Sequence, residues 1–168
     1  MQDGIHRVRG EEQIEAVRAL VWEFFGCLES RYPEMADELA AYQVEQNVAG
    51  DLENFAAVFL PPKGECFVAV HNGEPAGIVM LKPSGVNDCE LNRMYVRDAA
   101  RGNRLGRALG EAAVAEARAR GYDAVRLRAI YRHKEALPLY ESLGFQRYSD
   151  PALPRAGDGR FIYMVLTL

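Results

Sequence analysis

The chain has 168 residues, of which 49% are hydrophobic and 26% are charged, with a net charge of −4. This length is enough to bury one sizeable core, so we expect a single domain over residues 1–168. The acidic balance argues against a general nucleic-acid-binding protein, which usually has an excess of Lys and Arg. No apolar run approaches the ~18 residues that span a bilayer, and we see no signal-peptide pattern. We therefore expect a cytoplasmic protein with no membrane segment.

Three cysteines are the only sulfhydryl groups in the sequence: Cys27, Cys66 and Cys89. They are odd in number, far apart in the chain, and without the paired spacing of a metal site. The sequence therefore predicts reduced thiols of an intracellular protein and no bound metal.

The first third of the chain predicts a strand followed by helices. A short strand is expected over residues 5–8, and apolar residues at helical spacing predict a helix over 11–28. Pro33 stops that helix, and a more polar helix is predicted over 34–48. Pro61 and Pro62 then close a stretch that we expect to be irregular.

Three strands are predicted next. Residues 66–70 and 76–81 are joined across Asn72-Gly73, a pair of residues that favours a tight hairpin turn. A further strand is predicted over 88–96, with apolar residues toward its end.

The last third alternates between helices and strands. A helix over 104–120, a strand over 124–130 and a short helix over 134–143 precede two strands over 145–148 and 161–168. The complete order is strand, two helices, three strands, helix, strand, helix, two strands. This order predicts an α/β sandwich built around a mixed sheet.

The turn between residues 96 and 105 is rich in glycine and arginine, and it opens a helix. The first N–H groups of a helix have no internal partner, and the helix dipole adds positive potential, so such a turn suits a phosphate. It lacks both the phosphate-loop lysine and the dinucleotide glycine pattern. Gly102, Gly106 and Gly110 recur every four residues, and the alternative interpretation is close packing of the helix on the sheet.

Two motifs make a family resemblance visible. Val96 to Gly106, Val-Arg-Asp-Ala-Ala-Arg-Gly-Asn-Arg-Leu-Gly, resembles the pyrophosphate-binding motif of the GNAT superfamily of N-acetyltransferases. Residues 136–145, Ala-Leu-Pro-Leu-Tyr-Glu-Ser-Leu-Gly-Phe, resemble the second hallmark of that superfamily. The resemblance implies a mixed, mostly antiparallel central sheet flanked by helices. It also implies direct transfer of an acetyl group from acetyl-CoA to an amine, with both substrates bound together.

The resemblance also implies which residues hold acetyl-CoA. The pantetheine arm would lie along Met94, Tyr95 and Val96, on a strand that a bulge separates from its neighbour. Two positions depart from the family pattern, because Arg104 replaces a glycine and His133 replaces an asparagine. His133 stays a candidate for the pantetheine contact, and its alternative role is that of a helix-start residue. We expect Arg104 to keep helical backbone geometry and to add charge near a phosphate. The residues expected around the pyrophosphate are Arg101, Gly102, Asn103, Arg104, Leu105, Gly106 and Arg107.

Two side chains are the catalytic candidates. The resemblance gives Tyr140 the role of protonating the leaving thiolate, and its alternative role is that of a core aromatic. Glu90 is the candidate base for the amine, on the same strand face as Asn92 and Met94 by alternation. The alternative for Glu90 is an ion pair with a neighbouring arginine such as Arg93. A backbone N–H near Met94 would stabilise the developing oxyanion.

The acceptor is open at this point. The family resemblance places its pocket near Trp22, Phe25, Arg31, Tyr32 and Tyr42 on one side and near Tyr148 to Arg160 on the other. A carboxylate-bearing amine paired with Arg31 or Arg160, a peptide N-terminus, a polyamine and an antibiotic amine all remain candidates. A catalytically inactive acyl-CoA-binding sensor is the alternative function. A homodimer is compatible with the fold, because sheet edges in such folds often pair between chains.

Overall fold

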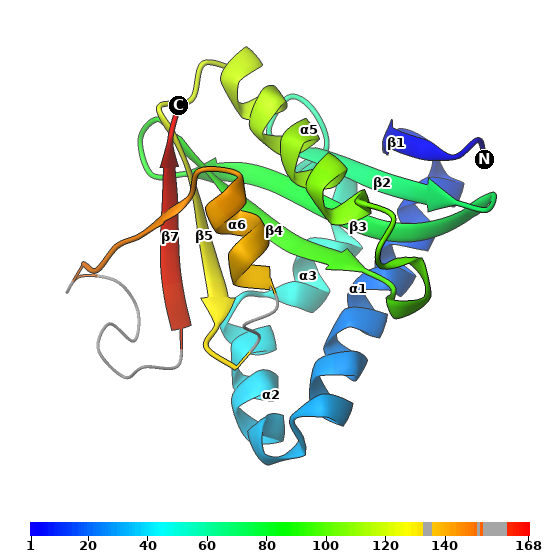
Figure 1. Ribbon diagram of the computed structural model, residues 1–168, viewed down its shortest axis with the longest axis horizontal. Coiled ribbons are helices and arrows are strands. Elements are labelled where there is room, and N and C mark those ends of the chain that lie inside the picture. Colours follow the sequence, from blue (N-terminus) through cyan, green and yellow to red (C-terminus); the bar gives the residue numbers. More distant parts are fainter. Residues whose placement is uncertain (133–135, 151, 153–160) are drawn as a thin grey trace.

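The computed structural model describes residues 1–132, 136–150, 152 and 161–168. Within them, seven strands form one sheet in the order β1-β2-β3-β4-β5-β7-β6 (Figure 1). Only the β4–β5 pair is parallel, so the mixed and mostly antiparallel sheet that the sequence predicts is confirmed. The strands are β1 Gly4–Arg7, β2 Glu65–His71, β3 Glu74–Ser84, β4 Asp88–Val96, β5 Ala124–Ile130, β6 Gln146–Arg147 and β7 Phe161–Thr167.

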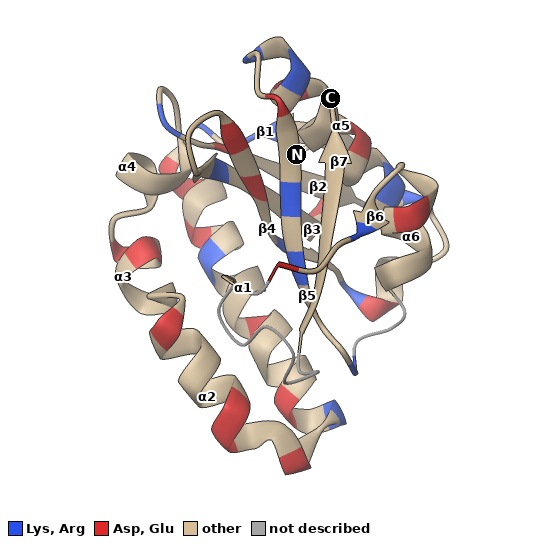
Figure 2. Ribbon diagram, turned by 90° about the vertical axis from the view of Figure 1, so that its left-hand side faces the viewer, with Lys and Arg blue, Asp and Glu red and all other residues tan. Residues whose placement is uncertain are grey.

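Helices cover both faces of the sheet. Helices α5 and α6 pack on one face, and α1 and α2 lie on the other (Figures 1 and 2). Each face has its own hydrophobic core, as in other layered α/β folds. Helices α2 and α3 carry several acidic residues (Figure 2). In that view α1 lies between these helices and the sheet. The helices are α1 Glu11–Arg31, α2 Ala36–Glu45, α3 Val48–Glu53, α4 Phe55–Phe59, α5 Leu105–Ala119 and α6 Leu137–Ser142.

The long helix α1 follows its sequence pattern. Its buried residues recur at helical spacing, from Ile14 and Val17 to Phe25 and Leu28, and they form much of the core on that face. The helix ends at Arg31, three residues beyond the prediction, and Pro33 begins a short 3-10 turn. Proline has no N–H to continue the ladder of helical hydrogen bonds, which explains why α1 stops there.

The β2–β3 hairpin is confirmed in its detail. Asn72 and Gly73 both have positive φ angles, 53° and 79°, and His71 pairs with Glu74 across the turn. Two consecutive left-handed residues match the twist of the flanking strands, and Asn-Gly adopts them at low cost.

The predicted irregular stretch before β2 contains two short helices, α3 and α4. With six and five residues they are too short for an apolar periodicity to be visible in the sequence. Their buried residues Leu52, Phe55 and Phe59 nevertheless complete the core beneath α1.

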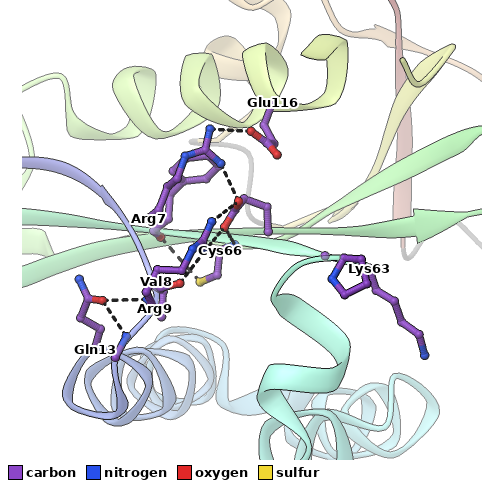
Figure 3. A network of polar contacts seen from close by, with 12 residues as sticks. Arg7, Val8, Arg9, Gln13, Lys63, Cys66 and Glu116 are labelled. Carbon is purple, nitrogen blue, oxygen red and sulfur yellow. Dashed lines mark hydrogen bonds and ion pairs between the residues drawn. The ribbon is translucent and has the colours of Figure 1, made fainter. Parts of the chain in front are cut away.

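A buried carboxylate joins β1, β2 and α5 (Figure 3). Glu65 is 1% exposed and accepts hydrogen bonds from Arg7 at 2.6 Å and from both terminal nitrogens of Arg9 at 2.7 Å. Arg7 also donates to Glu116 of α5 at 2.6 Å, and Glu116 accepts from Arg120 at 2.5 Å. The network therefore connects the edge strand to the helix that carries the glycine-rich turn.

Across the described residues, none of the helices combines the length and the apolar character needed to cross a membrane.

Candidate active site

The sheet opens between β4 and β5. These parallel strands pair at only three positions, from Asp88 with Ala124 to Glu90 with Arg126. Beyond Glu90 the two strands diverge, so residues 91–96 have no β5 partner. Their backbone groups on that side are available to a ligand that binds like an added strand.

A bulge in β4 lies beside this opening. Between the pairs Met80 with Asn92 and Ile78 with Tyr95, β4 advances three residues while β3 advances two. The extra residue is Arg93, whose φ of 53° is left-handed. A bulge of this kind bends the strand and shifts the alternation of its side chains.

The shifted alternation corrects one sequence prediction. Cys89, Leu91 and Met94 all pack against the core beneath α5, although simple alternation would separate Met94 from the other two. Glu90 and Met94 therefore do not share a face, contrary to the prediction. The cause is the bulge at Arg93, which the sequence pattern does not reveal.

A cavity of about 230 Å³ lies where β4, the turn before α5 and α6 meet. It brings together residues that the sequence analysis expected around acetyl-CoA with Tyr140, the expected proton donor. Of the expected residues, those that line it are Met94, Tyr95, Val96, Arg101, Gly102, Arg104, Leu105, Gly106 and Tyr140.

Two of the expected binding residues do not line this cavity. Asn103 donates to the backbone oxygen of Ala100 at 3.1 Å and does not line the cavity. Arg107 pairs with Glu111 at 3.1 Å and donates to Ser142, so its side chain points away from the cavity. His133 lies outside the described residues.

The turn before α5 has the geometry of an anion site. No described side chain caps the N-terminus of α5, and Ala108 is the residue whose N–H bonds to the oxygen of Arg104. The preceding N–H groups of the helix therefore have no helical partner, and the positive end of the helix dipole lies there. Arg101 lines the cavity while it pairs with Asp98 at 2.8 Å.

Arg104 is not helical, which corrects another prediction. Its φ is 58° and its ψ is 14°, in the left-handed region, and α5 begins at the next residue. The family motif has a glycine at this position, and glycine adopts this conformation without steric cost. Arg104 keeps the turn but with backbone strain.

Glycines let α5 approach its neighbours. A Cβ on Gly106 would lie 3.2 Å from Leu139, and one on Gly110 would lie 2.5 Å from Leu143 and 3.2 Å from Met94. The glycine spacing suggests close packing of the helix on the sheet, but the close neighbours of Gly106 and Gly110 are mainly in α6 and the residue that follows it, and of those within 3.2 Å only Met94 belongs to the sheet. Because Leu139 precedes Tyr140 on α6 and Leu143 is the C-cap of that helix, this packing positions the tyrosine.

Tyr140 lines the cavity and is almost completely buried. It is 7% exposed, its ring packs edge-on against Phe145 at 6.0 Å, and no described residue is a hydrogen-bond partner of its hydroxyl. Burial raises the pKa of Tyr140 above its ordinary value, with a smaller contribution from Tyr42. The hydroxyl therefore stays protonated at neutral pH and is available as a donor.

Tyr95 lines the cavity, but its hydroxyl is bonded to a residue of α1. Its hydroxyl donates to Glu23 of α1 at 2.9 Å, and Glu23 also accepts from Arg97. Burial, together with hydrogen bonds to Cys27 and Glu23, raises the pKa of Tyr95. This contact fixes β4 to α1, and the sequence analysis did not find it.

Glu90 faces a different cavity, of about 180 Å³, which Arg126, Arg128 and Tyr148 also line. It accepts a hydrogen bond from Asn92 at 2.8 Å, and Asn92 is buried. The ion pair with Arg93 considered as an alternative is not formed, because Arg93 extends over the ring of Phe25 instead.

A third and smaller cavity, of about 50 Å³, is called the narrow cavity here. It shares the lining residues Met94, Ala136 and Tyr140 with the cavity of about 230 Å³. Of the residues expected at the acceptor pocket, Tyr42 lines the narrow cavity. Phe25 does not line it, but its ring contacts the guanidinium of Arg93, which does. Two arginines that the sequence analysis did not assign to the pocket, Arg93 and Arg128, also line it.

The other expected acceptor residues are not in this cavity. Trp22 is 46% exposed, Tyr32 donates to the backbone oxygen of Arg132, and Arg31 lies 3.7 Å from Asp98. Most of the segment from Tyr148 to Arg160, including Arg160 itself, lies outside the described residues. In the part of the chain that is described, no group of three His, Cys, Asp or Glu residues could hold a metal ion.

Comparison with known proteins identifies the class to which this fold and site correspond. Residues 14–145 match the Acetyltransferase (GNAT) family, and the chain belongs to that family. N-acetylaspartate synthetase of Danio rerio is 34% identical over 123 residues, which are 68% of this chain. The chain spans 44% of the length of that synthetase.

Solved structures share the fold. A GNAT-family acetyltransferase from Staphylococcus aureus has a TM-score of 0.75 at 18% identity, covering 98% of this chain and 99% of its own. PaiA N-acetyltransferase of Thermoplasma acidophilum, solved in complex with coenzyme A, has a TM-score of 0.72 at 14% identity, and the match covers all of both chains.

Proposed function

We propose that this protein is an N-acetyltransferase that moves an acetyl group from acetyl-CoA to an amine while both substrates are bound. The observation that carries the proposal is the opening between β4 and β5. There Tyr140 lines both the cavity of about 230 Å³, which we call the donor cavity, and the narrow cavity. Membership of the GNAT family supports it, and so do relatives that are named N-acetyltransferases.

The residues around the larger cavity suit acetyl-CoA. The unpartnered N–H groups at the start of α5 would hold the pyrophosphate, and Gly102 and Gly106 leave room for close approach to the backbone. Residues 94–96 would pair with the amide groups of the pantetheine arm, since β5 does not use that side of β4.

Transfer needs the developing charges to be stabilised at both ends. The N–H of Met94, next to the bulge, would donate to the thioester oxygen as it becomes negative, an effect typically worth ~3 kcal/mol. As the carbon–nitrogen bond forms and the carbon–sulfur bond breaks, Tyr140 gives its proton to the departing sulfur.

The proton of the amine needs a second acceptor. We assign this role to Glu90, acting through water rather than by contact, because Glu90 lines the cavity of about 180 Å³ and neither of the two cavities that Tyr140 lines. Arg128 lines both the narrow cavity and the cavity of Glu90, so the two spaces are neighbours. The cytoplasmic location and the homodimer stay predictions from the sequence.

The first experiment is a calorimetric titration with acetyl-CoA, with dephospho-CoA and ATP as controls, followed by an assay of thiol release with a panel of amines. We expect micromolar binding that prefers acetyl-CoA, and thiol release that depends on an amine. Absence of binding at millimolar acetyl-CoA would contradict the proposal.

Tyr140→Phe separates an enzyme from an inactive acyl-CoA sensor. Loss of the proton donor is expected to lower kcat by about 100-fold, while the affinity for acetyl-CoA changes less than about twofold. Tyr122→Phe, beyond the far end of α5, is the matched control and is expected to keep full activity. Unchanged turnover in Tyr140→Phe would show that the tyrosine is not the donor.

A further inference from the structure

The narrow cavity contains a buried cation with an unusual position. Arg93 is 8% exposed, and the left-handed backbone of the bulge directs its side chain toward α1 and α2 instead of α5. Its guanidinium carbon lies 5.7 Å from the ring centre of Phe25 and 6.0 Å from that of Tyr42. Such ring contacts stabilise a cation by less than the free energy that burial of an unpaired ion costs.

A second guanidinium lies against the same aromatic ring. Arg128 of β5 lies 5.4 Å from the ring centre of Tyr42 and 5.2 Å from that of Phe161, and these two rings stack at 5.4 Å. Two cations that share one ring in a small cavity repel each other, and an anion bound between them would offset that repulsion.

In the described part of the chain, no carboxylate forms an ion pair with Arg93 or Arg128. Among the described residues, no carboxylate lies within 4.0 Å of either Arg93 or Arg128, and neither donates a side-chain hydrogen bond. Other arginines of the sheet are paired: Arg126, two residues before Arg128, lies 2.6 Å from Asp88. Glu90 lines a cavity together with Arg128, but its carboxylate accepts a hydrogen bond from Asn92 and forms no ion pair with Arg128.

The cavity also limits the size of what it can hold. Its volume of about 50 Å³ has room for roughly four water molecules. This is room for a few heavy atoms of a small ligand. Arg128 also lines the cavity of about 180 Å³, into which the rest of such a ligand would extend. Met94, Ala136 and Tyr140 line both the narrow cavity and the donor cavity, so an acceptor held here would lie beside the proposed proton donor.

We propose that the acceptor is a small amino dicarboxylate whose carboxylates bind Arg93 and Arg128 while its amine points toward Tyr140. This inference rests on the proposed acetyltransferase function and adds the substrate class. Two positive charges are balanced by two carboxylates, and the planar guanidinium matches a carboxylate with paired hydrogen bonds. Arg93 and Arg128 act by binding and orienting the acceptor.

Acceptor preference is the first test. Thiol release from acetyl-CoA is measured with aspartate, glutamate, alanine and spermidine. We expect kcat/KM for the better of aspartate and glutamate to exceed that for alanine about tenfold or more, and that for spermidine about a hundredfold or more, since hydrogen bonds to charged groups contribute about 1.5–3 kcal/mol. Equal values for all four amines would overturn the proposal.

Arg128→Gln is the main variant, because Arg128 lies on a regular strand whereas Arg93 forms the bulge. We expect KM for the preferred amino dicarboxylate to rise about tenfold or more, with KM for acetyl-CoA within about twofold of the parent. Arg118→Gln, on the exposed side of α5, is the matched control. An unchanged KM for the acceptor in Arg128→Gln would contradict the assignment.

Succinate tests the carboxylate site apart from turnover, because it has two carboxylates and no amine. We expect millimolar succinate to raise the melting temperature of the parent protein and not that of Arg128→Gln. If no amine is acetylated but succinate binds through Arg128, the proposed function fails and the carboxylate site stands. If succinate does not bind and carboxylates bring no preference, the site fails.

Discussion

At the scale of single residues, the left-handed backbone positions determine much of the site. Arg93 and Arg104 both have positive φ angles, which cost a residue with a Cβ about 1–2 kcal/mol. Arg93 forms the bulge beside the opening in the sheet, and Arg104 forms the turn that exposes the N–H groups of α5. Strained residues of this kind cluster at functional sites, because the surrounding structure holds them there.

Arg104→Gly is expected to change stability and ligand affinity in opposite directions. Glycine relieves the left-handed strain, so the free energy of unfolding should rise by about 0.5–1 kcal/mol in urea titrations. The loss of one cation near the phosphates should weaken acetyl-CoA binding by about two- to fivefold, measured by calorimetry.

Asn72→Gly is the matched control for that variant, since Asn72 is also left-handed but lies in the β2–β3 hairpin. It should leave acetyl-CoA affinity unchanged. A lower stability of Arg104→Gly, or an unchanged affinity, would show that strain or charge at residue 104 has been misread.

The residues that could be predicted are those that belong to a motif. The glycines of the turn and Tyr140 stand in recognisable sequence contexts, and they border the cavity as expected. Arg93 could not be predicted, because a bulge depends on the register between two strands and not on local residue types. The same shift explains why Glu90 and Met94 were wrongly placed on one face.

At the scale of elements, the buried network of Glu65 connects three of them. Burial alone would raise the pKa of Glu65, but hydrogen bonds from Arg9, the Cys66 N–H and Arg7 outweigh it and lower the pKa. A carboxylate whose folded pKa is lowered stabilises the protein above its unfolded pKa, near 4.3. That stability is lost as the pH falls through the folded pKa.

Glu65→Gln should therefore destabilise the protein in a pH-dependent way. We expect the free energy of unfolding to fall by about 3 kcal/mol at pH 7, because Arg7 and Arg9 lose their shared partner. The difference from the parent should shrink in urea titrations as the pH is lowered from about 5 toward 3.

The matched control for Glu65→Gln is Glu111→Gln, which removes an exposed partner of Arg107. It should cost less than about 0.5 kcal/mol at any of these pH values. A difference between Glu65→Gln and the parent that is independent of pH would mean that the ionised carboxylate is not the stabilising group.

Elements were predictable in proportion to their length and pattern. Helices α1 and α5 and the β2–β3 hairpin follow from apolar periodicity and from the Asn-Gly turn. Helices α3 and α4 do not, since one turn of helix leaves no periodic signal, and tertiary packing on α1 stabilises them instead.

At the scale of the whole molecule, the sheet consists of two parts that few backbone pairs connect. Strands β1 to β4 form one antiparallel part and β5 to β7 the other, and three residue pairs of β4 and β5 join them. The family resemblance predicted an opening at this place. Its position along β4 comes from the structure, because it depends on where the parallel pairing ends.

Acetyl-CoA is expected to protect this junction from hydrogen exchange. Protection should rise in residues 91–96 and 102–107, whose amides would bond to the ligand, while the β2–β3 hairpin provides the internal control. At a ligand concentration of 100 times Kd, the free energy of unfolding should rise by about 2.7 kcal/mol. Exchange that slows equally everywhere, or not at all at 91–96, would contradict binding along β4.

The divided sheet has a consequence for how fast the protein is degraded in a cell. On the proposed function, the substrate supplies the backbone partners that β5 does not give to β4, so a loaded molecule is harder to open than an empty one. Proteases degrade chains that open, and a few kcal/mol alter abundance severalfold. The amount of this enzyme would then follow the supply of acetyl-CoA, without any regulator acting on its gene.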